Sequence, residues 1–368
     1  FPLQYDYRSC AIINVFIIMA NILIDSDKKL NNLLSKLEEC REIGLDTEFI
    51  RESTYRPILA LVQISLPNGE IYLIDPQKIT NIQTIIDIMT NPNILKIIHS
   101  AKQDLEALYS FTGAFPVNIF DTQIAFNFLS EKSSIGYSAL VKNICDVDIK
   151  EGSWRTDWLK RPLSQEKIEY AADDVKYLIK IKNQLEKNLK IINRYTWFQE
   201  EQEIELKKSN IIIKTDDAWE KINYPLYFDS TDLYLLKKLA SWRERISIKY
   251  DVPKRWILSD SYLIKVMITN ENKTQDIISS MKQSIEQSER NDLENLLSCK
   301  KKIKNKNLLP KKDIEQKCNE VLSYVSDEFK IDPTIIANKR DMEMFVLTNN
   351  KTRFMKGWRY KIFGKLVQ

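Results

Sequence analysis

The chain has 368 residues, of which 43% are hydrophobic and 29% are charged, and it carries a formal net charge of +4. This composition is typical of globular proteins and excludes collagen-like and disordered chains, while the length allows two or three domains. A single histidine excludes a multi-histidine metal site, so we expect carboxylates to carry any enzymatic chemistry. Five widely spaced cysteines with no CxxC pair argue against zinc ribbons and disulfide frameworks, and favour a reducing cytoplasm.

The charges are divided unevenly along the chain. Residues 1–200 contain 23 basic and 26 acidic side chains, whereas residues 201–368 contain 32 and 25. An acidic first half suggests a site that holds cations, and a basic second half suggests binding to polyanions. A random scatter of charges over two solvated surfaces is the alternative.

The chain begins with an irregular segment and then becomes regular. The apolar run at 10–20 is too short for a membrane span and is a weak secretory signal, so residues 1–18 are interpreted as an upstream extension. A strand is predicted at Asn21–Ile24, followed by a capped helix that ends near Leu37.

Strand and helix patterns then alternate. Three apolar runs separated by turn residues are typical of an antiparallel meander, at Ile43–Phe49, Ile58–Leu66 and Glu70–Ile74. The elements expected after it are a helix, a strand and two further helices, at Ile82–Met89, Leu95–His99, Gln103–Phe111 and Gln165–Leu185. The predicted fold class is therefore α/β, with a mixed sheet flanked by helices.

From residue 232 onward the pattern is helical throughout. One bundle fits Asp232 to about Leu297, and a second, shorter bundle fits Lys312–Gln368. The lysine-rich segment 300–312, which contains Pro310, separates them. We therefore expect two all-α units after the α/β domain.

Asp46 and Glu48 are the first candidates for a functional site. Residues i and i+2 of a strand point to the same face, so the two carboxylates converge. A divalent cation is the simplest relief of their repulsion, and Mg²⁺ prefers oxygen ligands. Two acids at this spacing are also common by chance, so the pair alone does not establish a metal site.

Two further acids occupy informative positions. Asp104 follows the predicted strand that ends at His99, so it is either a site residue at the sheet edge or an ordinary first-turn acid. Tyr170 and Asp174 are four residues apart on a predicted helix and share one face, whereas Asp173 points elsewhere. A tyrosine packed on an ordinary amphipathic helix is the alternative.

The ordered set of an Asp-x-Glu strand, an Asp at a strand–helix junction and a Tyr-x-x-x-Asp helix resembles the tyrosine (DEDDy) branch of the DEDD exonuclease superfamily. Flanking sequences, from about Met19 to Gln184, resemble ribonuclease D more narrowly. The residues that carry this resemblance are Leu45-Asp46-Thr47-Glu48-Phe49, Leu61-Val62-Gln63-Ile64, Ile74-Asp75-Pro76, His99 with Asp104-Leu105-Glu106, Asp121-Thr122-Gln123, Arg155-Thr156-Asp157-Trp158, Arg161-Pro162-Leu163 and Glu169-Tyr170-Ala171-Ala172.

The resemblance implies an RNase H-like (DnaQ-like) exonuclease domain that acts as a two-metal-ion 3′→5′ exoribonuclease, releases 5′-mononucleotides and trims the 3′ ends of tRNA precursors. Its cofactors would be two divalent ions, Mg²⁺ or Mn²⁺. Asp46 would bridge both ions, and Asp104 would serve the ion at the leaving group. Glu48 and Asp174 would complete the site of the other ion, where Tyr170 would position the attacking water by a hydrogen bond.

Five other residues are candidates for contacts with the terminal nucleotides: Thr47, Gln63, His99, Arg155 and Trp158. An amide can bind a base or the backbone, a cation can bind a phosphate, and a ring can stack on a base. His99 is equally well explained as a residue that caps its loop, and Trp158 as part of the core.

Both helical units resemble the helicase-and-RNase-D C-terminal (HRDC) module. The first match is carried by Leu236, Leu239, Trp242-Arg243, Asp251-Val252-Pro253, Leu258 and Asp260, and the looser second match by Ile331-Asp332-Pro333, Asn338-Lys339-Arg340-Asp341, Gly357-Trp358-Arg359 and Phe363-Gly364. The expected divisions are an exonuclease domain at 19–205, a linker at 206–228, a first HRDC domain at 229–299, a lysine-rich linker at 300–312 and a second HRDC-like domain at 313–368.

The two basic runs of the tail are predicted to contact RNA. Seven lysines lie among the thirteen residues 300–312, and rings alternate with cations over 351–365. The residues expected to bind RNA are Lys300, Lys301, Lys302 and Arg359. A solvated linker and a set of rings that face the core are the alternative, and lysine counts are inflated by an AT-rich genome.

The predicted partner is RNA, in the form of tRNA precursors with single-stranded 3′ ends, and neither a membrane nor a protein partner is indicated. Two other functions stay open at this point. A DEDDy DNA exonuclease would share the same acidic site, and a non-catalytic RNA-binding scaffold would need a damaged one.

Overall fold

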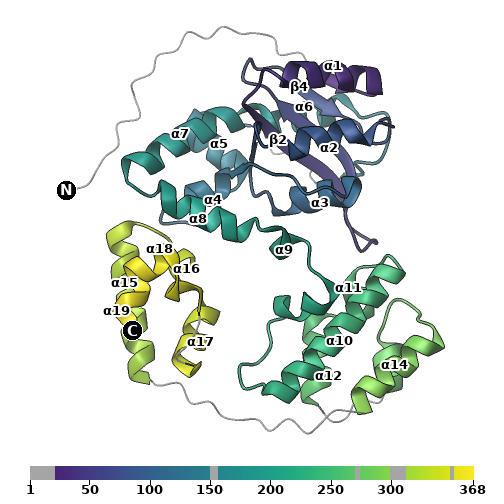
Figure 1. The fold of residues 1–368 in the computed structure, drawn as a ribbon, viewed down its shortest axis with the longest axis vertical. Coiled ribbons are helices and arrows are strands. Elements are labelled where there is room, and N and C mark those ends of the chain that lie inside the picture. Colours follow the sequence, from purple (N-terminus) through teal and green to yellow (C-terminus); the bar gives the residue numbers. More distant parts are fainter. Residues whose placement is uncertain (1–20, 150–155, 270–273, 299–311, 349–351) are drawn as a thin grey trace.

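The computed structural model describes residues 21–149, 156–269, 274–298, 312–348 and 352–368, and Figure 1 shows its fold. The first part of the chain, here called the sheet domain (residues 21–211), contains a six-stranded sheet in the order β1-β4-β3-β2-β5-β6. Its strands are β1 (Asn21–Ile24), β2 (Glu42–Ile50), β3 (Ile58–Ser65), β4 (Ile71–Ile74), β5 (Leu95–Ile98) and β6 (Ile119–Asp121).

The predicted mixed sheet is confirmed. β2, β3 and β4 form the antiparallel meander, while β1 pairs with β4, β5 with β2, and β6 with β5 in parallel. β6 lies outside the predicted strands, because three residues are too few to show an alternating pattern.

Helices cover both faces of the sheet (Figure 1). One face packs on α1 (Asp27–Leu37), α2 (Ile82–Thr90) and α3 (Lys102–Thr112). The other packs on α4 (Thr122–Asn127), α5 (Tyr137–Cys145), α6 (Gln165–Lys176) and α7 (Leu178–Ile191). Leu45 of β2 faces the first core, so the side chain of its neighbour Asp46 points toward the second, and Gly44 faces the same way.

The helix predicted over Gln165–Leu185 is two helices in the structure. α6 ends at Lys176 and α7 begins at Leu178, so the helix is interrupted at Tyr177. The apolar pattern continues across this break, because Val175, Leu178 and Ile181 are all buried on the same side. Hydrophobic periodicity therefore could not reveal it.

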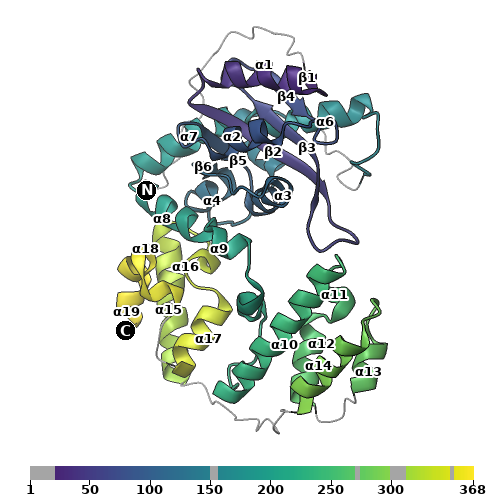
Figure 2. The same ribbon diagram turned by 45° about the vertical axis from the view of Figure 1, so that its right-hand side comes forward.

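A first helical unit (residues 215–298) follows α8 (Tyr195–Glu205) and α9 (Lys208–Ile211), as Figure 2 shows. Its elements are η1 (Thr215–Lys221), α10 (Ser230–Lys249), α11 (Lys254–Ile257), α12 (Asp260–Ile268), α13 (Thr274–Ser279) and α14 (Gln287–Ser298). Ala218, Ile222 and Phe228 belong to its core together with Leu236 of α10. The unit therefore includes part of the segment 206–228 that was predicted to be a linker.

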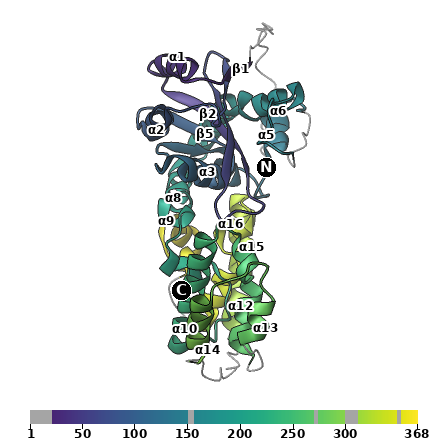
Figure 3. The same cartoon turned by 90° about the vertical axis from the view of Figure 1, so that its right-hand side faces the viewer.

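The second helical unit (residues 312–368) lies beside the first, below the sheet domain in the view of Figure 3. Its elements are α15 (Lys312–Phe329), α16 (Pro333–Ile336), α17 (Lys339–Thr348), η2 (Arg353–Met355), α18 (Gly357–Arg359), η3 (Tyr360–Gly364) and α19 (Lys365–Val367). Trp358 and Phe363 of this unit share one core with Phe128 and Phe198 of the sheet domain.

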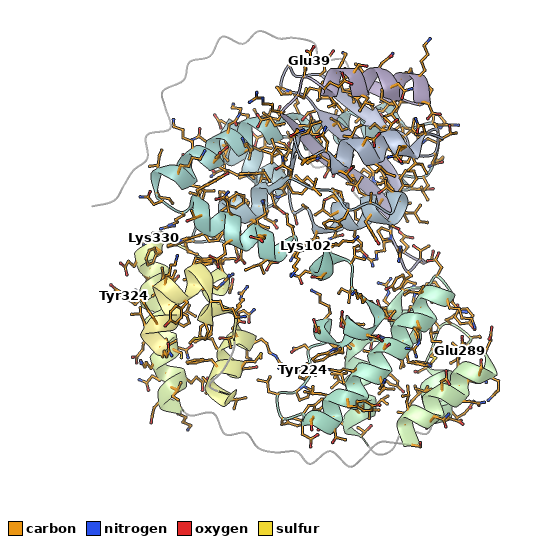
Figure 4. All side chains as sticks on the ribbon, in the orientation of Figure 1. Glu39, Lys102, Tyr224, Glu289, Tyr324 and Lys330 are labelled. Atoms are coloured by element: carbon orange, nitrogen blue, oxygen red, sulfur yellow. The ribbon has the colours of Figure 1, made fainter. Side chains whose placement is uncertain are left out.

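Lys330 and Tyr224, both labelled in Figure 4, make contacts between units. Lys330 Nζ of the second helical unit lies 3.4 Å from Glu131 Oε1 of the sheet domain. The guanidinium carbon of Arg340 lies 5.1 Å from the ring centroid of Tyr224, which joins the two helical units. Within the described ranges, no helix is both long enough and apolar enough to cross a membrane.

Candidate active site

Three carboxylates from β2 and α6 converge on the α6 face of the sheet. Ligand oxygens of Asp46, Glu48 and Asp174 all lie within 4.8 Å of one another, and each residue is half-buried. Asp46 and Glu48 share a face because they are two residues apart on β2, as predicted. Asp173, the neighbouring acid, instead lies 3.8 Å from Lys176 Nζ and does not join the group.

A close approach between β2 and the end of α6 brings Asp174 to the strand. Gly44 makes this approach possible, because a Cβ at that position would lie 3.0 Å from the carbonyl oxygen of Val175. The hydroxyl of Ser65 on β3 donates a hydrogen bond of 2.8 Å to the same carbonyl. Ala171 and Ala172 are buried, so the small residues of α6 also allow this packing.

Two tyrosines hold the end of α6. The Tyr170 hydroxyl donates a hydrogen bond to the carboxylate of Asp174. The Tyr137 hydroxyl donates to the carbonyl oxygen of Asp173 at 3.1 Å and accepts from the Tyr177 N–H at 3.3 Å. Tyr137 thus satisfies backbone groups where α6 stops, and no sequence pattern points to it, because it lies 36 residues away with no motif around it.

Asp104 lies in the first turn of α3, beside the group of three acids but outside it. Its side chain is 6% exposed, and the Thr47 hydroxyl donates to its Oδ1 at 2.6 Å. Asp104 is close enough to contribute to the raised pKa of Asp46. The structure therefore gathers all four acids predicted from the sequence, with Thr47 orienting the fourth.

The four acids disfavour one another's charge. Burial, followed by repulsion from the three other acids, raises the pKa of Asp46 well above its usual range. Burial also raises the pKa of Glu48 to about 9 and those of Asp104 and Asp174 to about 7. The Tyr170 pKa is raised by burial and by the nearby carboxylates, so its hydroxyl remains protonated and can donate a hydrogen bond.

This donor set fits a divalent metal. Carboxylate oxygens are the ligands that Mg²⁺ and Mn²⁺ prefer. The carboxylates repel one another, which raises their pKa values, and a bound cation would attract all of them instead. The site can therefore hold divalent metal ions.

Three of the residues predicted to contact substrate are buried. Thr47, Gln63 and Trp158 are 5%, 0% and 2% exposed, respectively, so they form part of the packing around the site, and their contact with a nucleotide stays a prediction. Gln63 is paired with Asp46 in the register of β2 and β3, and its amide has no hydrogen-bond partner among the described residues. The Trp158 ring lies 6.0 Å from the ring of Tyr170, so it supports that side chain rather than stacking on a base.

His99 holds its own loop. Its Nδ1 lies 2.9 Å from the Thr122 hydroxyl, and its Nε2 lies 3.0 Å from the carbonyl oxygen of Ile135. Burial lowers its pKa, so the ring is neutral near pH 7. With both nitrogens engaged, His99 has no free group for substrate, and the loop-capping alternative is the correct one.

The Asp75 and Arg161 motifs have a structural role. Arg161 binds the buried Asp75 carboxylate through Nε at 2.6 Å and through Nη2 at 2.8 Å. It also donates to the carbonyl oxygen of Trp158 at 2.6 Å. This bidentate pair anchors the loop that precedes α6 to the end of β4, and so fixes where α6 begins.

The predicted RNA-binding residues of the tail differ in outcome. Lys300, Lys301 and Lys302, like Arg155 of the sheet domain, lie outside the described residues. Arg359 is 3% exposed and pairs with the buried Glu201, so its prediction as an RNA contact is wrong. Of the interleaved rings, Trp358 and Phe363 are fully buried, as the core-facing alternative expects, whereas Tyr360 is 37% exposed.

Comparisons with known proteins agree with this fold. A family model described as 3′–5′ exonuclease matches residues 21–190. Ribonuclease D of Bartonella henselae is 31% identical over 366 residues, which cover 94% of this chain and 89% of that protein. Ribonuclease D of Desulfotalea psychrophila is 27% identical over 364 residues, with 94% and 97% covered.

A solved structure extends the agreement to the whole architecture. Escherichia coli RNase D, described as an exoribonuclease involved in structured RNA processing, superposes with a TM-score of 0.78 at 25% identity. The match covers 95% of this chain and 98% of that one, so it includes the helical region as well as the RNase H-like sheet domain. Since the similarity to these enzymes extends over nearly the whole chain, the protein belongs to the ribonuclease D family of hydrolytic 3′–5′ exoribonucleases.

Proposed function

We propose that this exoribonuclease works with two Mg²⁺ or Mn²⁺ ions and trims the 3′ ends of tRNA precursors, releasing 5′-mononucleotides. The observation that supports this most directly is the convergence of Asp46, Glu48 and Asp174, whose ligand oxygens lie within 4.8 Å of one another. The Escherichia coli relative is involved in structured RNA processing, which supports a folded RNA as the substrate.

Each acid has a proposed position around the metals. Asp46, which interacts with all three other acids, would contact both ions. Glu48 and Asp174 would complete one site, and Asp104, held by Thr47, would complete the other. When bound, the ions would lower the pKa of water and stabilise the departing 3′ oxygen.

Tyr170 has a separate role in the proposal. Its raised pKa keeps the hydroxyl protonated, so it orients water by a hydrogen bond and does not remove a proton. Its hydrogen bond to Asp174 fixes the position of the Tyr170 hydroxyl relative to the metal site.

The helical units are proposed to be HRDC modules that hold the body of the RNA. The segments concerned are 229–299, extended toward residue 215 by the packing of η1, and 313–368. Contacts through Lys300, Lys301 and Lys302 stay a prediction, as does the cytoplasmic location inferred from the cysteine pattern. A substrate made of RNA agrees with that location.

The metal assignment is tested by a matched pair of substitutions on α6. Asp174→Asn should lower kcat on a 3′-extended tRNA by at least about a hundredfold, because it removes a ligand and a fixed charge from the reacting centre. Asp173→Asn removes an equal charge one residue away, where the carboxylate pairs with Lys176, and should retain turnover. Asp46→Asn should abolish trimming while tRNA binding is retained, and EDTA should stop the wild-type enzyme. Full turnover by Asp46→Asn would refute the assignment.

The substrate is tested by side-by-side digestion. The wild-type enzyme should shorten a 3′-extended tRNA faster than single-stranded DNA of equal length, and the products should be 5′-mononucleotides. Faster degradation of the DNA would favour the DNA exonuclease alternative and overturn the proposed substrate.

A further inference from the structure

A polar pocket lies between the sheet domain and the first helical unit. It has a volume of about 330 Å³ and is lined by the loop after β2 and by residues of α10 to α12. Figure 2 shows that loop, residues 51–57, extending from the sheet toward α11. The Tyr55 N–H donates to Asp251 Oδ1 at 3.0 Å and the Tyr55 hydroxyl donates to Glu244, so the two walls are held together.

Cations outnumber acids among the residues that line the pocket. Four of its lining residues are cations, namely Arg51, Arg243, Lys254 and Arg255, whereas Asp260 is the one acid among the lining residues. Hydroxyls of Thr54 and Ser259 also line it. Such a set of donors around a small cavity fits a phosphate group.

The cations differ in how far they are already neutralised. Arg51 lies 2.7 Å from Glu106, and Arg243 lies 2.7 Å from Asp260. Lys254 is only loosely paired, at 3.6 Å from Glu244. Arg255 is exposed and has no ion-pair partner among the described residues. Lys254 and Arg255 therefore have charge available for a ligand.

The position of the pocket connects it to the site of cleavage. β2 carries Asp46 and Glu48 and runs directly into Arg51, three residues beyond Glu48. At a rise of about 3.3 Å per residue, this distance is about 10 Å along the strand. A nucleotide chain whose 3′ end lies at the acids could thus follow β2 and place a phosphate in the pocket within a few linkages.

We propose that this pocket binds a backbone phosphate of the RNA, a few linkages on the 5′ side of the bond that is cleaved. Lys254 and Arg255 supply the charge, and the Tyr55 contacts keep the pocket aligned with β2. The direction in which the RNA runs along β2 rests on the proposed function. Its binding contact does not depend on the metal assignment.

Binding measured in EDTA tests the contact without turnover. The probe is a single-stranded RNA of about twelve nucleotides with a 5′ fluorophore, and the protein is the full chain. The double variant Lys254→Ala/Arg255→Ala should raise Kd about tenfold. It should also flatten the slope of log K against log salt by about 0.7 for each phosphate that the protein no longer neutralises. Lys28→Ala, which removes an exposed cation from α1, should leave both quantities unchanged.

Neutral linkages locate the phosphate. One uncharged methylphosphonate is placed at each position of the RNA in turn. At a position a few linkages from the 3′ end, it should weaken binding to the wild type but not to the double variant. The proposal is wrong if the neutral linkage weakens RNA binding by both proteins equally at every position. It is also wrong if the double variant matches Lys28→Ala in Kd and in the salt slope. Saturation of the pocket by inorganic phosphate with no effect of the variants on RNA would identify an anion site and overturn it as well.

These results remain distinct from a failure of the proposed function. If the acids do not hold metal, Asp46→Asn will still trim RNA, whereas binding in EDTA will be unchanged. If the pocket does not bind RNA, the wild-type enzyme will still trim, and the double variant will bind as tightly as the control.

Discussion

The two helical units are attached to the sheet domain in different ways. The second unit is continuous with it, because Trp358 stacks on Trp197 at 5.4 Å and meets Phe128 edge-on at 5.1 Å within one core. The first unit has a core of its own, and the loop after β2 reaches it through polar contacts of Tyr55. One unit is therefore an extension of the catalytic domain, and the other is docked on it.

Because of this difference, similar aromatic and basic residues have different roles in the two helical units. The aromatic and basic residues of the second unit are used to build the junction with α8, and Gly357 is favoured there because its φ of +57° lies in the left-handed region. At the border of the docked unit, the loosely paired Lys254 and the exposed Arg255 line a pocket. A docked joint is thus the better place for a contact with RNA.

The largest effect is expected at the fused joint. Glu201 accepts hydrogen bonds from both terminal nitrogens of Arg359 and, at 3.3 Å, from Trp358 Nε1. Glu201→Ala should destabilise the protein by about 3–5 kcal/mol, because it leaves a buried guanidinium without its counter-charge. Urea unfolding followed by tryptophan fluorescence measures this loss.

Glu131→Ala is the matched control for that substitution. It removes a second ion pair between the same two units, but Lys330 and Glu131 are both exposed, so the loss should be below about 1 kcal/mol. Equal losses for the two variants would show that burial of the Glu201 pair does not matter and that the joint is not fused.

The next prediction distinguishes the sheet domain from the first helical unit by how the stability of each depends on pH. The carboxyl pKa values of Glu48, Asp104 and Asp174 are raised to about 9, 7 and 7, above their values in an unfolded chain. The native state therefore binds more protons than the unfolded state, and its stability falls as pH rises through these values. Between about pH 5 and pH 9, the metal-free sheet domain should therefore become progressively less stable.

Calorimetry at several pH values in EDTA measures this fall. Mn²⁺ should remove it, since the metal takes the place of the protons, and Asp46→Asn should make it shallower. The transition of the first helical unit should shift much less over the same range. A metal-free sheet domain that becomes more stable at high pH would contradict the raised pKa values.

The sequence predicts most of the sheet domain and much of its site. β2 alternates between apolar and polar residues, and β3 and β5 are mostly apolar runs, so the local pattern is sufficient for all three strands. β6 and the break at Tyr177 depend on packing partners instead, since the break is satisfied by Tyr137 from another helix. The acids of the site, such as Asp46 and Asp174, were predictable because both the residue type and the sequence spacing are restricted at a metal site.

The predictions that failed concern which partner a side chain finds. Thr47 donates a hydrogen bond to Asp104, and His99 is hydrogen-bonded to Thr122 and Ile135. In each case the partner is far away in the chain. Arg359 lies in a run that is locally indistinguishable from an RNA-binding segment. Its partner Glu201, 158 residues earlier, makes it a core residue, and no local pattern contains that information.

A smaller effect is expected where the first helical unit docks. Tyr55→Phe removes a hydrogen bond to Glu244, which is 1% exposed and whose second oxygen has no hydrogen-bond partner in the part of the chain that the structure describes. The docking interaction should weaken by about 1.5–3 kcal/mol, with no change in the unfolding of the sheet domain. Hydrogen exchange should accelerate in residues 51–57. Tyr234→Phe, on the exposed side of α10, should accelerate nothing there, and unchanged exchange in Tyr55→Phe would show that the loop is held by other contacts.

The smallest single effect is expected between the two helical units. Arg340→Ala removes a cation–π contact with Tyr224, which is worth about 0.5–1 kcal/mol. Tyr224 and Tyr55 hold the first unit at separate points, so either contact keeps the other at a high effective concentration. The double variant Tyr55→Phe/Arg340→Ala should therefore accelerate exchange at 51–57 by more than the product of the two single effects. A purely multiplicative result would show that the contacts act independently, and that the first unit does not dock as one rigid body.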